Sequence, residues 1–182
     1  MICNAFNNYF VQIGPLLAKE ITSTINPLSY VSSILNSIYI PPITEDELTI
    51  VILSLKNSSA GWDAIPASIV KQSIQFYIKP LTYLINQSFE LGIFPDELKL
   101  AKIIPLFKSG DKTSITNYRP ISVLSFFSKV FEKTMYNYLI NFIHINNILY
   151  DHQFGFRKSH STNHAIISLV EKVNNALDSG IF

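Results

Sequence analysis

The chain lacks several features that would assign it to a common protein class. Its 182 residues include a single cysteine, Cys3, which excludes an internal disulfide and a cysteine-based zinc site. No apolar run approaches the roughly 18 residues of a membrane-spanning helix, and the first residues lack the pattern of a secretory signal. The six glycines form no phosphate-binding loop, and no Gly-x-Ser-x-Gly motif is present. We therefore expect an intracellular protein with no membrane partner and no serine-hydrolase chemistry.

Charge is scarce and unevenly distributed. Hydrophobic residues make up 48% of the chain and charged residues 15%, which favours a folded chain of about one domain over a disordered one. Residues 1–98 hold 4 Lys and Arg against 8 Asp and Glu, whereas residues 99–182 hold 10 against 5. The two parts therefore carry net charges of −4 and +5. Segregated positive charge suits a phosphate-binding face, although charge alone favours a solvated basic surface without a partner.

Most of the pattern predicts helices. We expect helices over residues 3–24, 44–55, 66–92, 126–143 and 161–179, and a loosely ordered linker over residues 26–43. Proline should end or kink the first helix at Pro15 and divide the third at Pro80. Thr44 and Glu47 match a capping box, and Gly92 is a suitable C-terminal stop.

One β-hairpin interrupts the helices. Residues 101–107 read as a strand that Pro105 restricts to a sheet edge, Ser109-Gly110-Asp111-Lys112 has turn chemistry, and the return arm runs to Leu124. The hairpin carries four cations: Lys102, Lys108, Lys112 and Arg119. The predicted fold class is therefore α+β and mostly helical.

An aromatic and basic cluster precedes the last predicted helix. Gly155 lies between Phe154 and Phe156, where it allows a close backbone approach. Arg157 and Lys158 come just before a helix N-terminus, whose free N–H groups also attract phosphate. We interpret the two phenylalanines as core residues rather than as platforms for stacked bases.

Three motifs together resemble the reverse transcriptases of non-LTR (LINE-type) retrotransposons. They are Gly61-Trp62-Asp63-Ala64-Ile65-Pro66, the hairpin segment that includes Asn117-Tyr118-Arg119-Pro120-Ile121-Ser122, and Gln153-Phe154-Gly155-Phe156-Arg157. Their order and spacing agree with the family over about residues 44–180. In the first motif we expect Gly61 to form a turn, Trp62 to anchor packing and Asp63 to cap locally.

The resemblance implies a role for each cation. Lys108 and Arg119 would contact the triphosphate of the incoming nucleotide, because an arginine fork and a lysine point charge both suit phosphate. Four further cations would contact nucleic acid: Lys102, Lys112, Arg157 and Lys158. The residues alone favour a plainer reading, in which Arg119 pairs with a carboxylate and Lys108 is a solvated turn residue.

The resemblance also implies a fold and partners. It predicts a partial right-hand polymerase fold, with a fingers hairpin and supporting helices but no palm sheet. Residues 1–43 would be a variable helix and linker, and residues 44–182 the fingers and part of the palm of a reverse transcriptase domain. The partners would be an RNA template, a DNA primer, a dNTP and the rest of the polymerase domain, with magnesium in the full-length enzyme. The helices over 126–143 and 161–179 would pack on the palm, and without it their apolar faces would be exposed.

The chain departs from the family in its acidic residues. It contains no Asp-Asp pair, and in family order the strand with the first catalytic aspartate would follow Phe182. We therefore expect no catalytic residue, no bound metal and no activity in this chain alone. His160 and His164 have ligand spacing, but surface histidines are favoured over a zinc site. Two alternatives stay open: a non-catalytic nucleic-acid-binding module, and the non-functional product of a decayed element.

Overall fold

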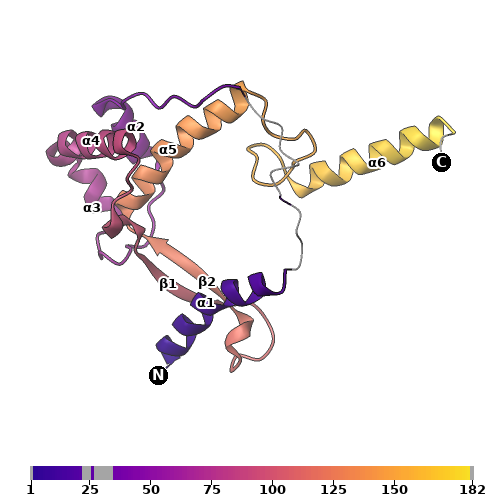
Figure 1. Cartoon of the computed structure of the whole chain (residues 1–182), viewed down its shortest axis with the longest axis horizontal. Coiled ribbons are helices and arrows are strands. Elements are labelled where there is room, and N and C mark those ends of the chain that lie inside the picture. The colour runs from indigo at the N-terminus through magenta and orange to yellow at the C-terminus, as the bar shows by residue number, and fades with distance from the viewer. Residues whose placement is uncertain (1, 22–25, 27–34, 181–182) are drawn as a thin grey trace. The chain divides into compact units, whose positions relative to one another are not determined.

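The computed structural model describes residues 2–21, 26 and 35–180 and divides into two compact units (Figure 1). The first unit is Met1–Tyr138 and the second is Leu139–Phe182. The elements in chain order are α1 (Ile2–Lys19), α2 (Glu45–Ser54), α3 (Ala67–Gln72), α4 (Ile74–Leu91), the 3₁₀-helix η2 (Asp96–Lys99), β1 (Ala101–Phe107), the 3₁₀-helix η3 (Ile115–Asn117), β2 (Tyr118–Leu124), α5 (Phe126–Ile145) and α6 (Thr162–Asp178). The α+β class and the dominance of helices are thus confirmed. Residues 27–34 of the predicted linker over 26–43 lie outside the described residues, and residues 35–43 form no helix or strand.

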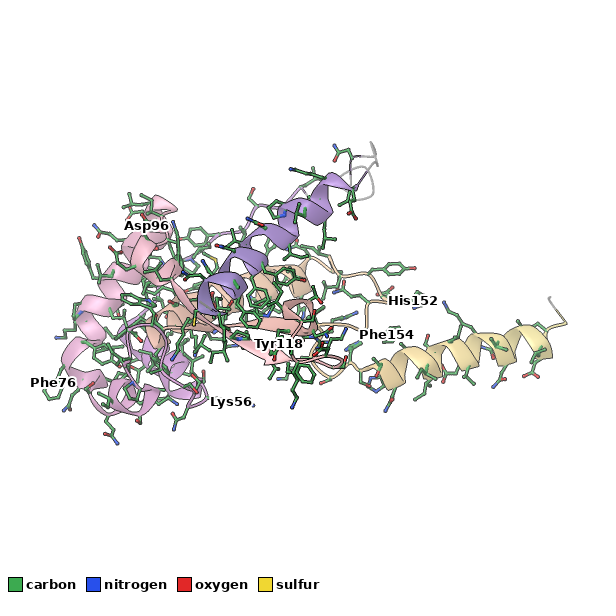
Figure 2. The ribbon with its side chains drawn as sticks, turned by 90° about the horizontal axis from the view of Figure 1, so that it is seen from below. Lys56, Phe76, Asp96, Tyr118, His152 and Phe154 are labelled. Atoms are coloured by element: carbon green, nitrogen blue, oxygen red, sulfur yellow. The ribbon has the colours of Figure 1, made fainter. Side chains whose placement is uncertain are left out.

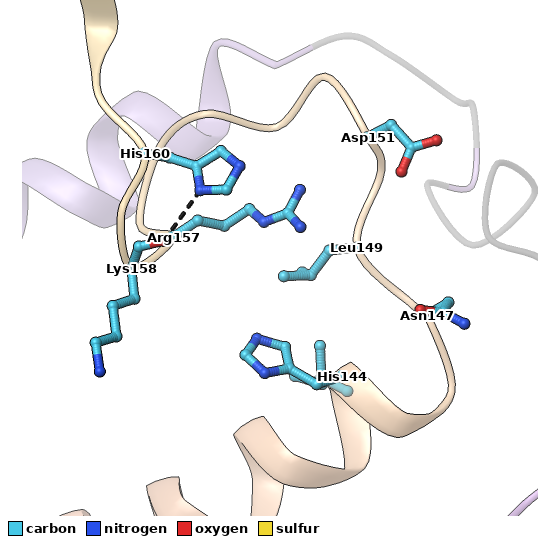
Figure 3. Close-up of a pocket in the computed structure, with 8 residues that line it drawn as sticks. His144, Asn147, Leu149, Asp151, Arg157, Lys158 and His160 are labelled. Carbon is cyan, nitrogen blue, oxygen red and sulfur yellow. Dashed lines mark hydrogen bonds between the residues drawn. The ribbon is translucent and has the colours of Figure 1, made fainter. Parts of the chain in front are cut away.

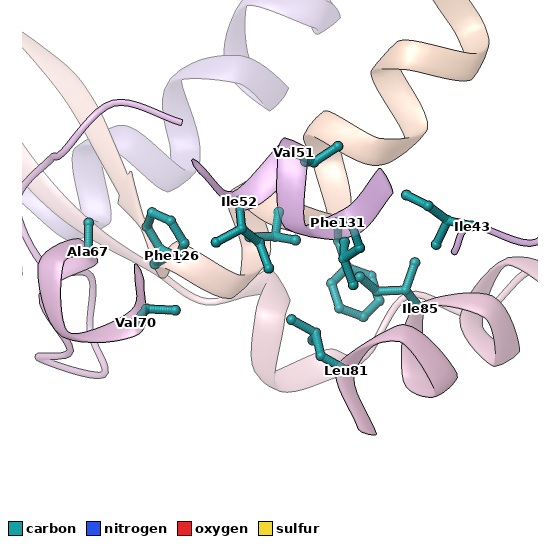
Figure 4. Packing of buried hydrophobic residues seen from close by; sticks show 11 residues of the cluster. Ile43, Val51, Ile52, Ala67, Val70, Leu81, Ile85, Phe126 and Phe131 are labelled. Atoms are coloured by element: carbon teal, nitrogen blue, oxygen red, sulfur yellow. The ribbon is translucent and has the colours of Figure 1, made fainter. Parts of the chain in front are cut away.

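The core of the first unit forms where α2, α3, α4 and α5 meet. Their buried side chains and Ile43 form one apolar cluster (Figure 4): Ile43, Leu48, Val51, Ile52, Ala67, Val70, Leu81, Ile85, Phe126, Val130 and Phe131. Around it, Phe131 makes edge-on contacts with Phe89 and Phe94 at ring-centroid distances of 6.5 and 5.8 Å. The first half of α5 is therefore part of this core, and the expectation that its apolar face is exposed without a palm sheet is wrong for that half.

Two sets of hydrogen bonds fix the start of α2. The capping box is confirmed: Glu47 N–H donates to Thr44 Oγ1 at 3.2 Å, and Thr44 N–H donates to Glu47 Oε2 at 2.9 Å. Just before it, the side-chain amide of Asn86 on α4 binds both backbone groups of Ile43, accepting from its N–H at 2.8 Å and donating to its carbonyl at 3.0 Å. These two hydrogen bonds attach the backbone just before α2 to α4.

Pro15 does not end its helix, and Pro80 does not divide its helix as predicted. Pro15 lies inside α1, which continues to Lys19, and Pro80 lies inside α4. The break between α3 and α4 comes instead at Ser73, whose backbone N–H and hydroxyl both donate to Ile69 O, at 3.0 and 2.8 Å. Pro80 is exposed, so the helix carbonyl that loses its N–H partner can be hydrated.

Glycines end one helix and allow one close contact. Gly92 ends α4 in the left-handed conformation with φ 66°, and the next N–H, of Ile93, donates to Ser88 O at 3.0 Å. Gly61 is buried against the junction of β2 and α5, where a Cβ atom would lie 2.6 Å from Ser125 N. Its role is therefore this backbone contact as well as the turn closed by the bond from Ala64 N–H to Gly61 O, 3.3 Å.

The sequence also predicted roles for Trp62 and Asp63, which follow Gly61 in the same motif. Asp63 caps locally as expected, since its Oδ1 accepts from Ile65 N–H at 3.2 Å. Trp62 is 48% exposed, so the prediction of a packing anchor is wrong. The backbone of Gly61, rather than the indole ring, provides the tight contact of this loop.

The second unit holds the end of α5, a loop and α6. Asn147 ends α5 with a positive φ of 48°, while Ile148 N–H donates to Ile143 O at 3.1 Å, so asparagine takes the position that glycine usually fills. Ser161 is the N-cap of α6, although its side chain makes no capping hydrogen bond. No described residue of α6 is buried, and its apolar face is exposed as expected.

Candidate nucleic-acid interface

The register of the hairpin decides which of its cations share a face. β1 and β2 pair antiparallel, with Leu106 opposite Arg119 and Lys102 opposite Val123. Side chains that lie opposite one another, and those two residues apart along a strand, point to the same face. Lys102 and Arg119 therefore share one face, together with the exposed side chains of Ile104, Leu106 and Ile121.

Lys108 joins this face at the end of the ladder. It directly follows β1, and its N–H still donates to Asn117 O at 2.8 Å, so the alternation of side chains extends one residue further. Lys108 is then the diagonal neighbour of Arg119, at a typical separation of about 7–8 Å. Residues so spaced can both reach the oxygens of one polyphosphate.

These cations have no carboxylate partner within the described part of the chain. The one ion pair found there joins Lys99 and Asp96 at 2.6 Å, and both side chains are exposed. Arg119 and Lys108 are exposed and make no side-chain hydrogen bond there. The plainer interpretation, in which a carboxylate neutralises Arg119, is therefore wrong for the described residues.

The loop that joins the strands is held by the first residue of the Asn-Tyr-Arg-Pro motif. Asn117 Nδ2 donates to Asp111 O at 2.9 Å and lies 2.8 Å from where a Cβ on Gly110 would be. Asp111 accepts from the N–H and hydroxyl of Thr113 at 2.8 and 2.7 Å, and these hydrogen bonds lower the pKa of its carboxyl. Gly110 has a φ of 90°, which side chains rarely allow, and a Cβ there would clash with Asn117. Both the backbone conformation and the lack of space therefore require glycine at this position. Asn117 is thus structural, a role that the sequence motif by itself does not reveal.

Lys112 lies on the other face of the hairpin from Arg119. Phe107 and Tyr118 are directly opposite each other in the register, one position away from the Leu106–Arg119 pair, and therefore point to the second face. Lys112 Nζ lies 5.8 Å from the ring centroid of Phe107. The ring of Tyr118 also meets Phe6 of α1 edge-on at 4.9 Å. The four hairpin cations are therefore divided, three to one face and Lys112 to the other.

The second unit contains a basic pocket of its own (Figure 3). The pocket measures about 380 Å³ and is lined by Ile143, His144, Asn147, Leu149, Asp151, Arg157, Lys158 and His160. Arg157 is half-buried and donates to Tyr150 O at 3.4 Å, while His160 Nδ1 lies 3.0 Å from Lys158 O. Asp151 is the one carboxylate in the lining. Arg157 and Lys158, both predicted from the sequence to contact nucleic acid, are thus brought to one pocket.

The aromatic residues of that loop do not both behave as predicted. Phe154 is partly buried, with its ring centroid 6.1 Å from that of His160. Phe156 is 107% exposed and has a positive φ of 59°. The interpretation of Phe156 as a core residue is therefore wrong, because the left-handed backbone turns its side chain out of the loop.

One basic pocket was missed at the level of sequence. It measures about 440 Å³ in the first unit and is lined by Leu55, Lys56, Ser58, Lys129, Glu132, Lys133 and Tyr136. Lys129 Nζ donates to Ser58 Oγ at 2.7 Å, and Lys133 Nζ lies 4.4 Å from the ring centroid of Tyr136. The spacing of Lys129 and Lys133, four apart on one helix, was the available signal.

The described residues offer little to a metal ion. No group of three or more His, Cys, Asp or Glu side chains in the described part of the chain is placed to hold one. The rings of His160 and His164 lie 6.2 Å apart, without a third ligand in that region. Within the same residues, no helix combines the length and the apolar character needed to cross a membrane.

Comparison with known proteins identifies relatives among mobile elements. The chain is 35% identical over 144 residues, 78% of its length, to the probable RNA-directed DNA polymerase from transposon BS of Drosophila melanogaster. It is 33% identical over 142 residues to the probable RNA-directed DNA polymerase from transposon X-element of the same species, and 30% identical over 109 residues to that of the mobile element jockey. The matches span 16%, 16% and 12% of these relatives. No protein-family model matches the chain. These relatives agree with the family that the sequence motifs indicated, and the chain matches a segment of the reverse transcriptases of non-LTR (LINE-type) retrotransposons.

Proposed function

We propose that this chain is the substrate-holding portion of an RNA-directed DNA polymerase. The observation that carries the proposal is the pair Lys108 and Arg119, diagonal neighbours on one hairpin face that form no ion pair with any carboxylate among the described residues. An arginine fork can bind two phosphate oxygens while a lysine supplies a mobile charge. Their role is to hold the triphosphate of an incoming dNTP.

The remaining cations would hold the RNA template and DNA primer. Lys102 lies on the same face, four residues before Leu106, which is the strand partner of Arg119. Arg157 and Lys158 line a pocket in the second unit, and Lys112 lies on the second face of the hairpin. Contacts of this kind bind the sugar–phosphate backbone without reading sequence. In this proposal residues 44–182 are the fingers and part of the palm of a right-hand polymerase fold, preceded by a variable segment over 1–43.

Nucleotide transfer is not assigned to this chain by itself. The family enzyme is proposed to use magnesium, which would stabilise charge on the reacting phosphate. The side chains described here do not fit that role, since they form no cluster of acidic ligands and the sequence contains no Asp-Asp pair. The chain alone should therefore fail to extend a DNA primer on an RNA template with dNTPs and magnesium, and extension would contradict this assignment.

A fluorescent dNTP tests the hairpin directly. Fluorescence anisotropy of the labelled nucleotide, titrated with the whole chain, should show binding that Arg119→Ala weakens by about tenfold, because charge-assisted hydrogen bonds are lost. Arg119→Lys should recover only part of the loss, since lysine lacks the planar fork. Lys112→Ala is the matched control, because it removes the same charge from the opposite face. Equal losses for Arg119→Ala and Lys112→Ala would reduce the effect to net charge and refute the assignment.

RNA binding across a salt series tests the second part of the proposal. Filter binding of a single-stranded RNA should weaken as salt rises, with a slope of about −0.7 for each phosphate contacted. A triple variant carrying Lys108→Ala, Arg119→Ala and Arg157→Ala should bind more weakly and with a shallower slope. Unchanged affinity would exclude nucleic-acid binding by these residues. RNA binding without any dNTP binding would favour a stand-alone binding module over the polymerase portion.

A further inference from the structure

Phe156 is a fully exposed aromatic ring on an unusual backbone. Its side chain is 107% exposed, and its φ of 59° lies in the left-handed region that bulky residues rarely adopt. The residue before it, Gly155, has no atom within 4 Å of where a Cβ would lie, so nothing in the described residues covers this bend. The loop holds a large apolar surface in water, and such conformations cluster at ligand contacts.

The neighbours of Phe156 provide the second, independent observation. The next two residues, Arg157 and Lys158, line the basic pocket together with His144 and His160. Neither cation forms an ion pair with Asp151 or with any other carboxylate in the described chain. An exposed ring and two cations of a basic pocket are thus supplied by consecutive residues, whose Cα atoms are about 3.8 Å apart.

We propose that this loop is a binding site for a single-stranded nucleic acid, in which Phe156 stacks on an unpaired base. The backbone phosphate of the same strand would lie in the pocket beside Arg157 and Lys158. The inference rests on the proposed function, and it specifies the class of ligand at the loop.

The chemistry of stacking selects an unpaired strand. Both faces of a base inside a duplex are covered by its neighbours, so a protein ring can stack only on a base that is splayed out or at an end. Every base has a π-face, and stacking therefore tolerates any sequence. The site combines an electrostatic contact that salt weakens with a stacking contact that salt leaves almost unchanged.

Binding of the whole chain to a fluorescein-labelled oligouridylate and to a blunt RNA duplex tests the inference. Phe156→Ala should weaken binding to the single strand by about tenfold while leaving the salt slope unchanged. Binding to the duplex should not change. Phe76→Ala is the matched control, since Phe76 is also an exposed phenylalanine, at 78%, on α4 of the first unit (Figure 2). That control should bind like the parent.

A tryptophan reporter distinguishes stacking from a general effect on the loop. The chain has one tryptophan, so Trp62→Phe combined with Phe156→Trp leaves a single indole at the site. This variant should retain affinity and lose fluorescence as the oligouridylate binds.

The outcomes separate this inference from the proposed function. If Arg157→Ala weakens RNA binding but Phe156→Ala matches Phe76→Ala and the indole is not quenched, stacking is overturned and the proposed function stands. If Phe156→Ala weakens single-strand and duplex binding equally, the selectivity for an unpaired strand is overturned. If the parent chain binds neither RNA, both the inference and the nucleic-acid part of the proposed function fail.

Discussion

Replacing Gly61 with alanine should destabilise the first unit more than any other single methyl group added at a glycine. The new Cβ would lie 2.6 Å from Ser125 N, 2.7 Å from Ser125 Cα and 2.8 Å from Leu124 C. Comfortable separations between such atoms are about 3.5–4.0 Å. All three obstacles are backbone atoms, so no side-chain rotation relieves the clash and the β2–α5 junction itself must move by nearly 1 Å.

The expected net loss is about 2 kcal/mol in the free energy of unfolding. Overpacking in a core typically costs about 1–3 kcal/mol, and a contact with rigid backbone on a buried residue belongs at the upper end. The reduced freedom of the unfolded chain offsets about 0.4–1 kcal/mol of the clash. Since small domains are stable by about 5–15 kcal/mol, the variant should unfold at a clearly lower urea concentration.

Urea unfolding measures this loss. Circular dichroism reports the helices, and fluorescence of Trp62, the single tryptophan, reports the loop beside the substitution. Gly14→Ala makes the same chemical change inside α1, where a Cβ would meet no atom within 4 Å, and it should leave stability unchanged or raise it by up to about 1 kcal/mol. A Gly61→Ala protein within about 0.5 kcal/mol of the parent would refute the argument from backbone contact.

Two further substitutions test the polar contacts around α2. Thr44→Ala removes the capping box and should lower stability by about 1 kcal/mol in urea unfolding. The hydrogen bonds from the backbone N–H and the hydroxyl of Thr44 lower the pKa of Glu47 below its usual 4.5, so their stabilisation is present above pH 4.5 and is lost as pH falls through the folded pKa. Thr44→Ala keeps the backbone N–H and loses only the hydroxyl, so acid titrations of this variant should show a smaller loss of stability than those of the parent. Asn86→Ala leaves the N–H and carbonyl of Ile43 without partners and should cost about 1–3 kcal/mol. The neighbouring exposed Gln87→Ala should be neutral, and equal losses at the two positions would contradict the specific role of Asn86.

Local signals in the sequence were reliable where the interactions are local. The strand Ala101–Phe107, the Thr44 capping box and the Gly92 stop were predicted correctly, because each depends on atoms within a few residues. Proline at position 80 was misread, since its effect depends on whether the carbonyl it leaves unpaired can be hydrated.

The candidate site was predicted less completely than the elements that carry it. Residue types and spacing identified the cations, but they could not show that Lys112 lies on the other face from Arg119, which follows from the strand register. The exposure of Phe156 was also missed, because a phenylalanine between Gly155 and Arg157 in the sequence can be either buried or exposed in the folded chain.

The amino-acid sequence by itself determined the family, the α+β class and the set of basic residues, since these depend on residue identity and short-range spacing. Tertiary structure decided which of those residues act together. It brought Lys108 beside Arg119, left both without a carboxylate partner in the described part of the chain, and packed Gly61 against a backbone more than sixty residues away. The physical reason is that side-chain direction and packing distance are set by atoms that are remote in sequence, and only the folded chain brings those atoms into contact.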